Sequence, residues 1–438
     1  MISMTFVFMT DLNNTEQEAN IVEIEQSSVK SMTMPFTEPI KVIQTNTDSQ
    51  PAPNIAIDDS GKMLVIYPST ENGITNLYIK SSMDNGKSFL TPVRVNSIDG
   101  NVVLDGRVAP AISFGKDGQV YALWANSTPE PNLFMGVYRT LVFTQSMDGG
   151  KSFLPSIEIA ANELPSGKFF QNMAVSGDGN IHVAWLDSPV KNNGTGYLVS
   201  DSSRPSTVRY SQSMDGGKSF MPTKALDENP CPCCNVQLAT DAESNVYVSW
   251  RGVFGEGETQ IRDMVVASSS NSGKIFSSPV KIHEDNFNFN GCVHVGAPMD
   301  VDSKGNLHVV WYTGSESSPG IYYATSSDHG QTFSQPVPIL TSDWVPPLRV
   351  YLTIDDNDTT WITWEDATGL SINDKVWRYS ETEAMIFAAK ITSDGKIIKF
   401  DKSVSVDGAK SPAIASGNNV VSIVWTGIDN SVQLATIP

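Results

Sequence analysis

A short apolar pattern recurs seven times along the chain. In each copy, apolar residues alternate with small or polar ones and the segment ends in an aromatic residue, as in a half-buried β-strand. The seven terminal aromatic residues are Tyr67, Trp124, Trp185, Trp250, Trp311, Trp364 and Trp425. A turn rich in Gly, Asp or Asn precedes each copy, which predicts a tight hairpin with the strand before it.

An octapeptide of the form Ser-x-Asp-x-Gly-x-Ser/Thr-Phe keeps pace with these strands. Its copies are Ser82–Phe89, Ser146–Phe153, Ser213–Phe220 and Ser326–Phe333, with a degenerate copy at Ser269–Phe276. Ser and Asp side chains accept hydrogen bonds from nearby backbone N–H groups, and Gly supplies a positive φ. We therefore interpret the octapeptide as a structural turn. The pattern of an EF-hand calcium loop, with its terminal Glu, is absent.

Each repeat predicts four strands: one after a Pro-rich entry, one ending at the aromatic residue, one running into the octapeptide and one following it. Repeated four-stranded units are typical of a β-propeller. The segment Glu38–Ile43 resembles a fourth strand with no repeat before it, whereas the last repeat has only three strands. We therefore predict an all-β, seven-bladed β-propeller whose N-terminal strand closes the last blade. Six blades plus an irregular module is the alternative.

The domain organisation follows from this pattern. Residues 36–438 are predicted to form a single propeller domain, and residues 1–35 a flexible acidic leader whose apolar start could be the remnant of a secretion signal. The chain contains no run of about 18 apolar residues, so we expect no membrane span within it.

Charge excludes some classes of partner. The chain carries 29 Lys and Arg against 48 Asp and Glu, a net charge of −19. Nucleic acids and anionic membranes both require a basic surface, so we predict neither as a partner. Four Asn-x-Ser/Thr sequons fit an extracellular or cell-surface location, and they begin at Asn13, Asn126, Asn193 and Asn357. We expect a monomer.

The octapeptide resembles the Asp-box, or BNR repeat, of the sialidase-like propellers. This resemblance extends roughly from Thr37 to Pro438. It implies a glycan or glycoprotein partner, but that superfamily includes sialidases, other glycan-active enzymes and non-enzymatic propellers. Whether the chain is an enzyme stays open. If it is one, the resemblance implies a glycoside hydrolase of the exo-sialidase type.

The long connections join the second and third strands of a blade, and long loops on a scaffold of short turns are where sites usually lie. Sialidases clamp a substrate carboxylate with three arginines and attack with a Tyr that a Glu activates. The family's Arg-Ile-Pro motif is absent, and Arg107-Val108-Ala109-Pro110 is the nearest match. The resemblance implies as candidate catalytic residues Arg107, Arg251, Arg349, Tyr351 and Glu258.

The cysteines give a second candidate site. There are four of them: Cys231, Cys233, Cys234 and Cys292. Cys231 and Cys292 each precede the next terminal aromatic residue by 19 positions, and Cys233 and His294 each precede it by 17. Equivalent positions in adjacent blades lie side by side, so we expect four thiols and an imidazole to converge. By contrast, His182 and His308 share an offset in two second strands and are interpreted as a repeated packing position.

Three interpretations of the cysteine cluster stay open. Two disulfides could join adjacent loops. Alternatively, Cys231, Cys233, Cys234, Cys292 and His294 offer the soft ligands that zinc or copper prefers. Free or redox-active thiols are the third. The order Cys-x-Cys-Cys, Trp-Arg, Arg-Asp and Gly-Cys-x-His also resembles a subgroup of sialidase-like propellers with no known activity.

The sequence therefore supports two hypotheses. The first is glycan binding or hydrolysis at the channel mouth. The second is a non-enzymatic surface scaffold or binding propeller, with the cluster as a disulfide staple or a Zn/Cu site.

Overall fold

The computed structural model describes residues 34–45, 51–133, 137–289, 293–343, 345–346, 349–366 and 384–437. All of them belong to the compact unit Ser31–Pro438, and nearly all of the predicted leader lies outside the described residues. Among the described residues, the 3-10 helix η2 (Gly257–Thr259) is the only helix, and no helix is long and apolar enough to cross a membrane.

The described strands form seven antiparallel sheets. Blade 1 consists of β2 (Asn54–Ile57), β3 (Met63–Glu71), β4 (Ile74–Ser82) and β5 (Val93–Arg94). Blade 2 consists of β6 (Ala111–Phe114), β7 (Val120–Pro129), β8 (Val137–Ser146) and β9 (Ile157–Ile159). Blade 3 consists of β10 (Ser166–Val175), β11 (Ile181–Asn192), β13 (Thr207–Ser213) and β14 (Lys224–Asp227), and β12 (Leu198–Ser200) pairs with β11.

Blades 4 to 7 repeat this order. Blade 4 consists of β15 (Gln237–Thr240), β16 (Val246–Arg251), β17 (Met264–Ser269) and β18 (Val280–Lys281), and blade 5 of β19 (Met299–Val301), β20 (Leu307–Thr313), β21 (Gly320–Ser326) and β22 (Val337–Thr341). Blade 6 consists of β23 (Val350–Ile354), β24 (Thr360–Asp366), β25 (Met385–Ile391) and β26 (Ile397–Lys399). Blade 7 consists of β27 (Lys410–Gly417), β28 (Val420–Thr426), β29 (Ser431–Ile437) and β1 (Ile40–Gln44). The predicted all-β propeller is confirmed with seven blades, and the six-bladed alternative is wrong.

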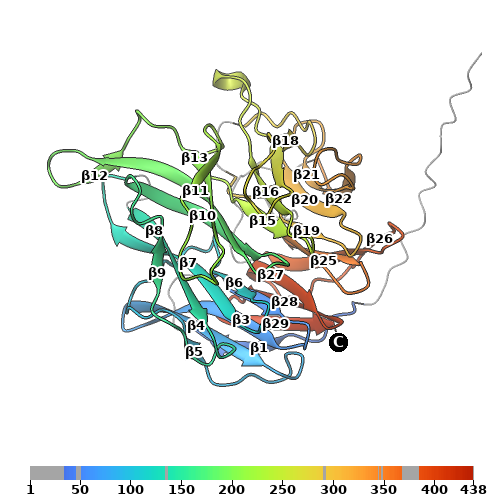
Figure 1. Cartoon of the computed structure of the whole chain (residues 1–438). Helices are drawn as coiled ribbons and strands as arrows, with labels where there is room; N and C mark the ends of the chain where they lie inside the picture. Colours follow the sequence, from blue (N-terminus) through green and yellow to red (C-terminus); the bar gives the residue numbers. More distant parts are fainter. Residues whose placement is uncertain are drawn as a thin grey trace, which may run out of the picture. The chain divides into compact units, whose positions relative to one another are not determined.

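The ring closes through the two ends of the described chain. The inner strands contact one another in order from β2 to β27, and β27 contacts β2 again. In blade 7, β1 pairs antiparallel with β29, with Ile40 opposite Leu434, and the Thr37 N–H donates to the Thr436 carbonyl at 2.9 Å. Figure 1 shows β1, in blue, beside the red C-terminal strands. The predicted closure by the N-terminal strand is therefore confirmed.

The apolar repeat forms the core between adjacent blades. Trp124 of β7, for example, packs in one cluster with Leu64 and Ile79 of blade 1 and is 1% exposed. Trp185, Trp250, Trp311 and Trp425 are buried in the same way. Burying one large apolar side chain contributes roughly 1.5–3 kcal/mol, so each blade stabilises its neighbour.

The octapeptides form the predicted turns. In the second copy, the Asp148 carboxylate accepts hydrogen bonds from the Ser152 N–H at 2.9 Å and the Ser152 hydroxyl at 2.6 Å, while the Ser146 hydroxyl accepts one from the Gly150 N–H at 2.7 Å. Asp84, Asp215 and Asp328 make the same bonds. The turn thus satisfies its own backbone and needs no bound cation.

His182 and His308 occupy the predicted packing position. Each is buried, and each ring contacts a tyrosine hydroxyl on the third strand of its blade at 2.6 Å, from Tyr210 and Tyr323 respectively. Burial lowers the pKa of His182 to about 4, and the charge of Asp178 offsets only part of this effect. The folded protein therefore holds His182 neutral where the unfolded chain would protonate it.

We predict that this histidine makes stability depend on pH. Because its pKa is lower in the folded state, its contribution is complete above about pH 6.5 and is lost as the pH falls towards 4. Replacing it with glutamine (His182→Gln) should shrink the drop in unfolding free energy between pH 7 and pH 4.5 by about 2–3 kcal/mol. Urea denaturation at both pH values measures this drop. His329→Asn, at an exposed position, should keep the full drop; a drop that both variants share with the wild type contradicts the prediction.

Candidate functional site

The two ends of the central channel carry different connections. Turns between first and second strands lie beside the octapeptides: the Lys62 ammonium donates to the Gly149 carbonyl, and the Ser272 hydroxyl donates to the Asp178 carboxylate at 2.9 Å. We call this end the turn face and the opposite end the loop face. On the turn face the channel opens into a polar cavity of about 700 Å³, lined by residues that include Asp58, Phe114, Ser176, Asp241 and Ser416.

A segment of blade 2 crosses the channel on the loop face. The Gly106 carbonyl accepts a hydrogen bond from the Ser411 hydroxyl at 3.0 Å, and the Arg107 carbonyl accepts one from the Asn235 amide at 3.3 Å. Ser411 belongs to blade 7 and Asn235 precedes β15 of blade 4. Because those blades lie on opposite sides of blade 2 in the ring, the segment at Gly106 and Arg107 spans the mouth of the channel.

Asp105 anchors this segment between two arginines. Its carboxylate accepts two hydrogen bonds from Arg107, both at 2.8 Å, and forms an ion pair with Arg139 at 2.8 Å. Burial alone would raise the pKa of Asp105, but the hydrogen bonds from Arg107 and the charges of both arginines outweigh it and hold the pKa at about 2. The Arg139 guanidinium also lies 5.2 Å from the centre of the Phe169 ring. Asp105 is therefore ionised at neutral pH and fixes both guanidinium groups.

Arg349 approaches the same mouth from blade 6. Its Nη1 atom donates to the Ser411 hydroxyl at 2.8 Å and lies 3.6 Å from the Glu365 carboxylate, which also accepts a hydrogen bond from the Ser411 N–H at 3.1 Å. Burial raises the pKa of the nearby Tyr351, which also responds to the charges of Arg349 and Glu365. Ser411 therefore joins Arg349 to the segment that carries Arg107, and Tyr351 lies near enough to respond to the charge of Arg349.

The other two candidates are placed differently. Arg251 is 1% exposed, and its guanidinium donates to the Arg262 and Tyr312 carbonyls at 2.8 and 2.9 Å. The central carbon of this guanidinium, Cζ, lies 5.4 Å from the centre of the Phe287 ring. It therefore ties blade 4 to blade 5. Glu258 belongs to η2, and its side chain lies outside the described part of the structure.

The carboxylate whose charge acts on Tyr351 is that of Glu365, which is not among the residues predicted from the sequence. A signal for it exists in the repeat. Glu365 directly follows the terminal aromatic residue of its second strand, as Arg251 does, whereas that position is uncharged in the other five blades, as at Leu186 and Thr426. Like Arg251, Glu365 is 1% exposed, so a charged residue at this position marks a buried polar contact between blades.

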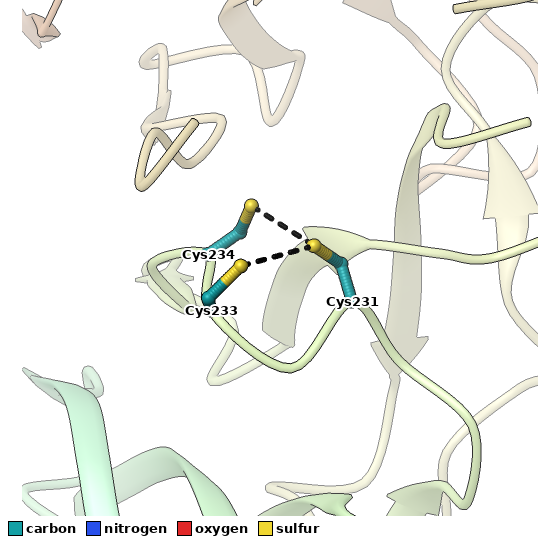
Figure 2. Close-up of side chains that lie close together, drawn as sticks. All are labelled: Cys231, Cys233 and Cys234. Carbon is teal, nitrogen blue, oxygen red and sulfur yellow. Dashed lines mark hydrogen bonds between the residues drawn. The ribbon is translucent and has the colours of Figure 1, made fainter. Parts of the chain in front are cut away.

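Three of the predicted cysteines converge (Figure 2). Cys231 Sγ lies 3.3 Å from Cys234 Sγ and 3.8 Å from Cys233 Sγ, and all three residues are at most 2% exposed. Cys231 and Cys234 are free thiols, whereas Cys233 is disulfide-bonded. Cys292 lies outside the described residues. The His294 ring contacts the same loop, because its Nδ1 atom donates to the Cys233 carbonyl at 2.8 Å.

Positive charge surrounds these thiols. Arg262 Nη1 lies 3.6 Å from Cys231 Sγ. The hydrogen bond from Cys234 and the charges of Arg251 and Arg262 outweigh burial and lower the pKa of Cys231, whereas burial raises the pKa of Cys234. One sulfur thus favours the thiolate and the other the thiol.

This environment bears on the metal hypothesis. The sulfur atoms of the three cysteines lie within 4.8 Å of one another, and soft sulfur ligands suit zinc and copper. However, a disulfide sulfur offers no thiolate, so the described cluster has two available thiols, and the guanidinium groups of Arg251 and Arg262 repel a cation. The geometry suits a dithiol better than a metal centre.

A second cavity adjoins the cluster on the loop face. It has a volume of about 360 Å³ and lies beside the long hairpin of β11 and β12. Its lining includes the aromatic ring of Phe169, the ion-paired Asp201 and Arg204, and the Pro232 and Cys233 backbone turn. A small molecule in this cavity would reach the edge of the cysteine loop.

No family model and no curated protein matches this chain. Among solved structures, it is similar to an ulvan lyase, a polysaccharide lyase bound to -[GlcA(1-4)Rha3S]- (TM-score 0.52, 11% identity, covering 92% of this chain and 94% of that one). Its structural neighbours are sialidase-like and other glycan-active β-propellers.

Two further neighbours cover most of the chain. One is the K499G mutant of the NanB sialidase from Streptococcus pneumoniae (TM-score 0.46, 13% identity, covering 95% of this chain and 72% of that one). The other is a protein of unknown function from Dyadobacter fermentans (TM-score 0.47, 14% identity, covering 92% and 98%). The shared feature is the fold.

We predict that Asp105→Asn destabilises the protein. The substitution leaves the buried Arg139 and the partly buried Arg107 without their counter-charge, which should lower the unfolding free energy by about 2–4 kcal/mol. Urea denaturation at pH 7 measures the change. Asp429→Asn removes an equal charge from an exposed pair with Lys41 and should change stability little. Equal losses in the two variants would contradict a special role for Asp105.

Proposed function

We propose that the chain binds carboxylated glycans at the loop-face mouth of the channel, through Arg107 and Arg349. One observation carries the proposal. The Ser411 hydroxyl contacts both the Gly106 carbonyl and the Arg349 guanidinium, at 3.0 and 2.8 Å, so arginines from blades 2 and 6 share one mouth. Their side chains are 28% and 23% exposed, which leaves both within reach of a ligand.

The charges favour an acidic ligand. The mouth contains three arginines, Arg107, Arg139 and Arg349, against two carboxylates, Asp105 and Glu365. The local balance is therefore positive in a chain of net charge −19. A guanidinium matches a carboxylate with two parallel hydrogen bonds, and the fixed positions of these arginines reduce the entropy lost on binding.

The contacts favour recognition over hydrolysis. A tyrosine nucleophile needs a nearby base to take its proton. The pKa of Tyr351 is raised, and the Glu365 carboxylate already accepts a hydrogen bond from the Ser411 N–H and faces Arg349. In this arrangement Glu365 positions the arginine. The proposal therefore assigns binding to the mouth, by a monomer at the cell surface or outside the cell, where such polysaccharides are found.

The neighbours support the same class of ligand. One solved structure of this fold, the ulvan lyase, holds a saccharide that contains GlcA. Since the likeness extends to the fold alone, the choice of an acidic sugar for this chain rests on the arginines.

We predict that Arg349→Met weakens binding of a glucuronate-containing oligosaccharide by about 10- to 100-fold, because a charge-assisted hydrogen bond contributes roughly 1.5–3 kcal/mol. Isothermal titration calorimetry measures the affinity, with a neutral oligosaccharide of equal length for comparison. The same titration, followed by product analysis, would reveal any cleavage.

Arg94→Met is the matched control. It removes the same charge from an ion pair with Asp99 on the outer strand of blade 1 and should leave the affinity unchanged. Equal affinity for the acidic and the neutral oligosaccharide, or no effect of Arg349→Met, would overturn the proposal.

A further inference from the structure

We propose that Cys231 and Cys234 form a redox-active dithiol that closes to a disulfide when a small peroxide oxidises it. This proposal is independent of glycan binding, because none of its groups belongs to the arginine mouth.

The spacing and geometry of the two thiols suit this reaction. Cys231-Pro232-Cys233-Cys234 places two free cysteines in a Cys-x-x-Cys arrangement across a turn at residues 232–234. Their sulfur atoms are 3.3 Å apart and point toward one another (Figure 2), so a covalent bond requires a movement of about 1 Å. Cys233 already takes part in a disulfide, which leaves these two as the reacting pair.

The surroundings give the two sulfurs different roles. Arg262 contacts Cys231 Sγ at 3.6 Å, and this guanidinium is itself oriented by Gln260, whose side-chain oxygen accepts its hydrogen bond at 3.2 Å. Arg251 supplies a second positive charge and is fixed by two backbone carbonyls. Nearby guanidinium groups stabilise a thiolate, which is the nucleophilic form of cysteine. Cys231 is therefore the attacking sulfur and Cys234 the resolving one.

Access limits the oxidant to a small molecule. Cys231 and Cys234 are each 2% exposed, so a protein disulfide would not reach them. The cavity of about 360 Å³ is lined by Pro232 and Cys233 of the same loop, so it admits a small peroxide as far as the edge of the cluster.

The chemistry balances in two steps. The Cys231 thiolate attacks one oxygen of hydrogen peroxide; the O–O bond breaks, Cys231 becomes a sulfenic acid, and the departing hydroxide takes a proton to become water. The Cys234 sulfur then attacks Cys231 Sγ, and the hydroxyl leaves as water with the proton of the Cys234 thiol. Two thiols and one peroxide thus give one disulfide and two waters, and a thiol reductant reverses the change.

Differential alkylation with mass spectrometry tests the proposal. The full chain is exposed to stoichiometric hydrogen peroxide, denatured without reductant and alkylated. Before oxidation, Cys231 and Cys234 should both be labelled. Afterwards neither should be, and the mass should fall by two hydrogens, with the new link mapped within residues 231–234.

Variants separate the steps. In Cys234→Ser, Cys231 should stop at the sulfenic acid, which dimedone traps; in Cys231→Ser, Cys234 should stay a thiol. Arg262→Met should slow oxidation several-fold, and Arg262→Lys should restore much of the rate. The arginine variants keep the test valid even if a cysteine variant fails to fold.

Three results would overturn the proposal. They are thiols that stay alkylatable after peroxide treatment, a new disulfide mapped between Cys231 and Cys233, and about one equivalent of zinc or copper held by the thiols in protein purified without chelators.

Discussion

A blade of this protein can bury its faces only against the blades beside it, so every blade depends on closure of the ring. The tryptophans that end the second strands fill the spaces between neighbouring sheets, and an open ring would expose one such surface at each end. The pairing of β1 with β29 removes that gap by building one blade from two distant segments. Closure of the ring also sets the positions of the loop-face residues, because these residues come from blades 2 to 7.

Closure also explains why polar groups from distant parts of the sequence meet at the channel. Ser411 and Asn235 hold the same short segment of blade 2 although they are far apart in the chain. Ser411 and His294 adopt positive φ angles of 50° and 58° at the entries to their inner strands, a conformation that is costly for residues other than glycine. Such strain persists only where the surroundings fix the backbone, and here both residues contact the network at the channel mouth.

Much of the fold could be predicted from the sequence because the same pattern occurs seven times, so each copy supports the interpretation of the others. The position of each second strand and the closing role of the N-terminal strand followed from one alternating pattern. Equal offsets from Trp250 and Trp311 predicted that four cysteines and His294 converge; Cys231, Cys233 and Cys234 do lie together and His294 contacts their loop, while Cys292 lies outside the described residues. The ion pairs of Arg139 with Asp105 and of Glu365 with Arg349 could not be predicted, because each joins a strand to a connection between blades, and these connections have no periodicity. The burial of Arg251 was hidden for a related reason: one of its acceptors, the Tyr312 carbonyl, belongs to the next blade.

The pairing in blade 7 has a mechanical consequence. Ile40, where β1 begins, lies opposite Leu434, and the preceding Thr37 N–H donates to the Thr436 carbonyl, so the chain enters β1 beside the end at which β29 leaves the sheet. A force pulling these two strands apart would load their hydrogen bonds one after another rather than all together. The ring should thus resist heat and denaturant as a cooperative unit, yet open at this seam under a modest directed pull.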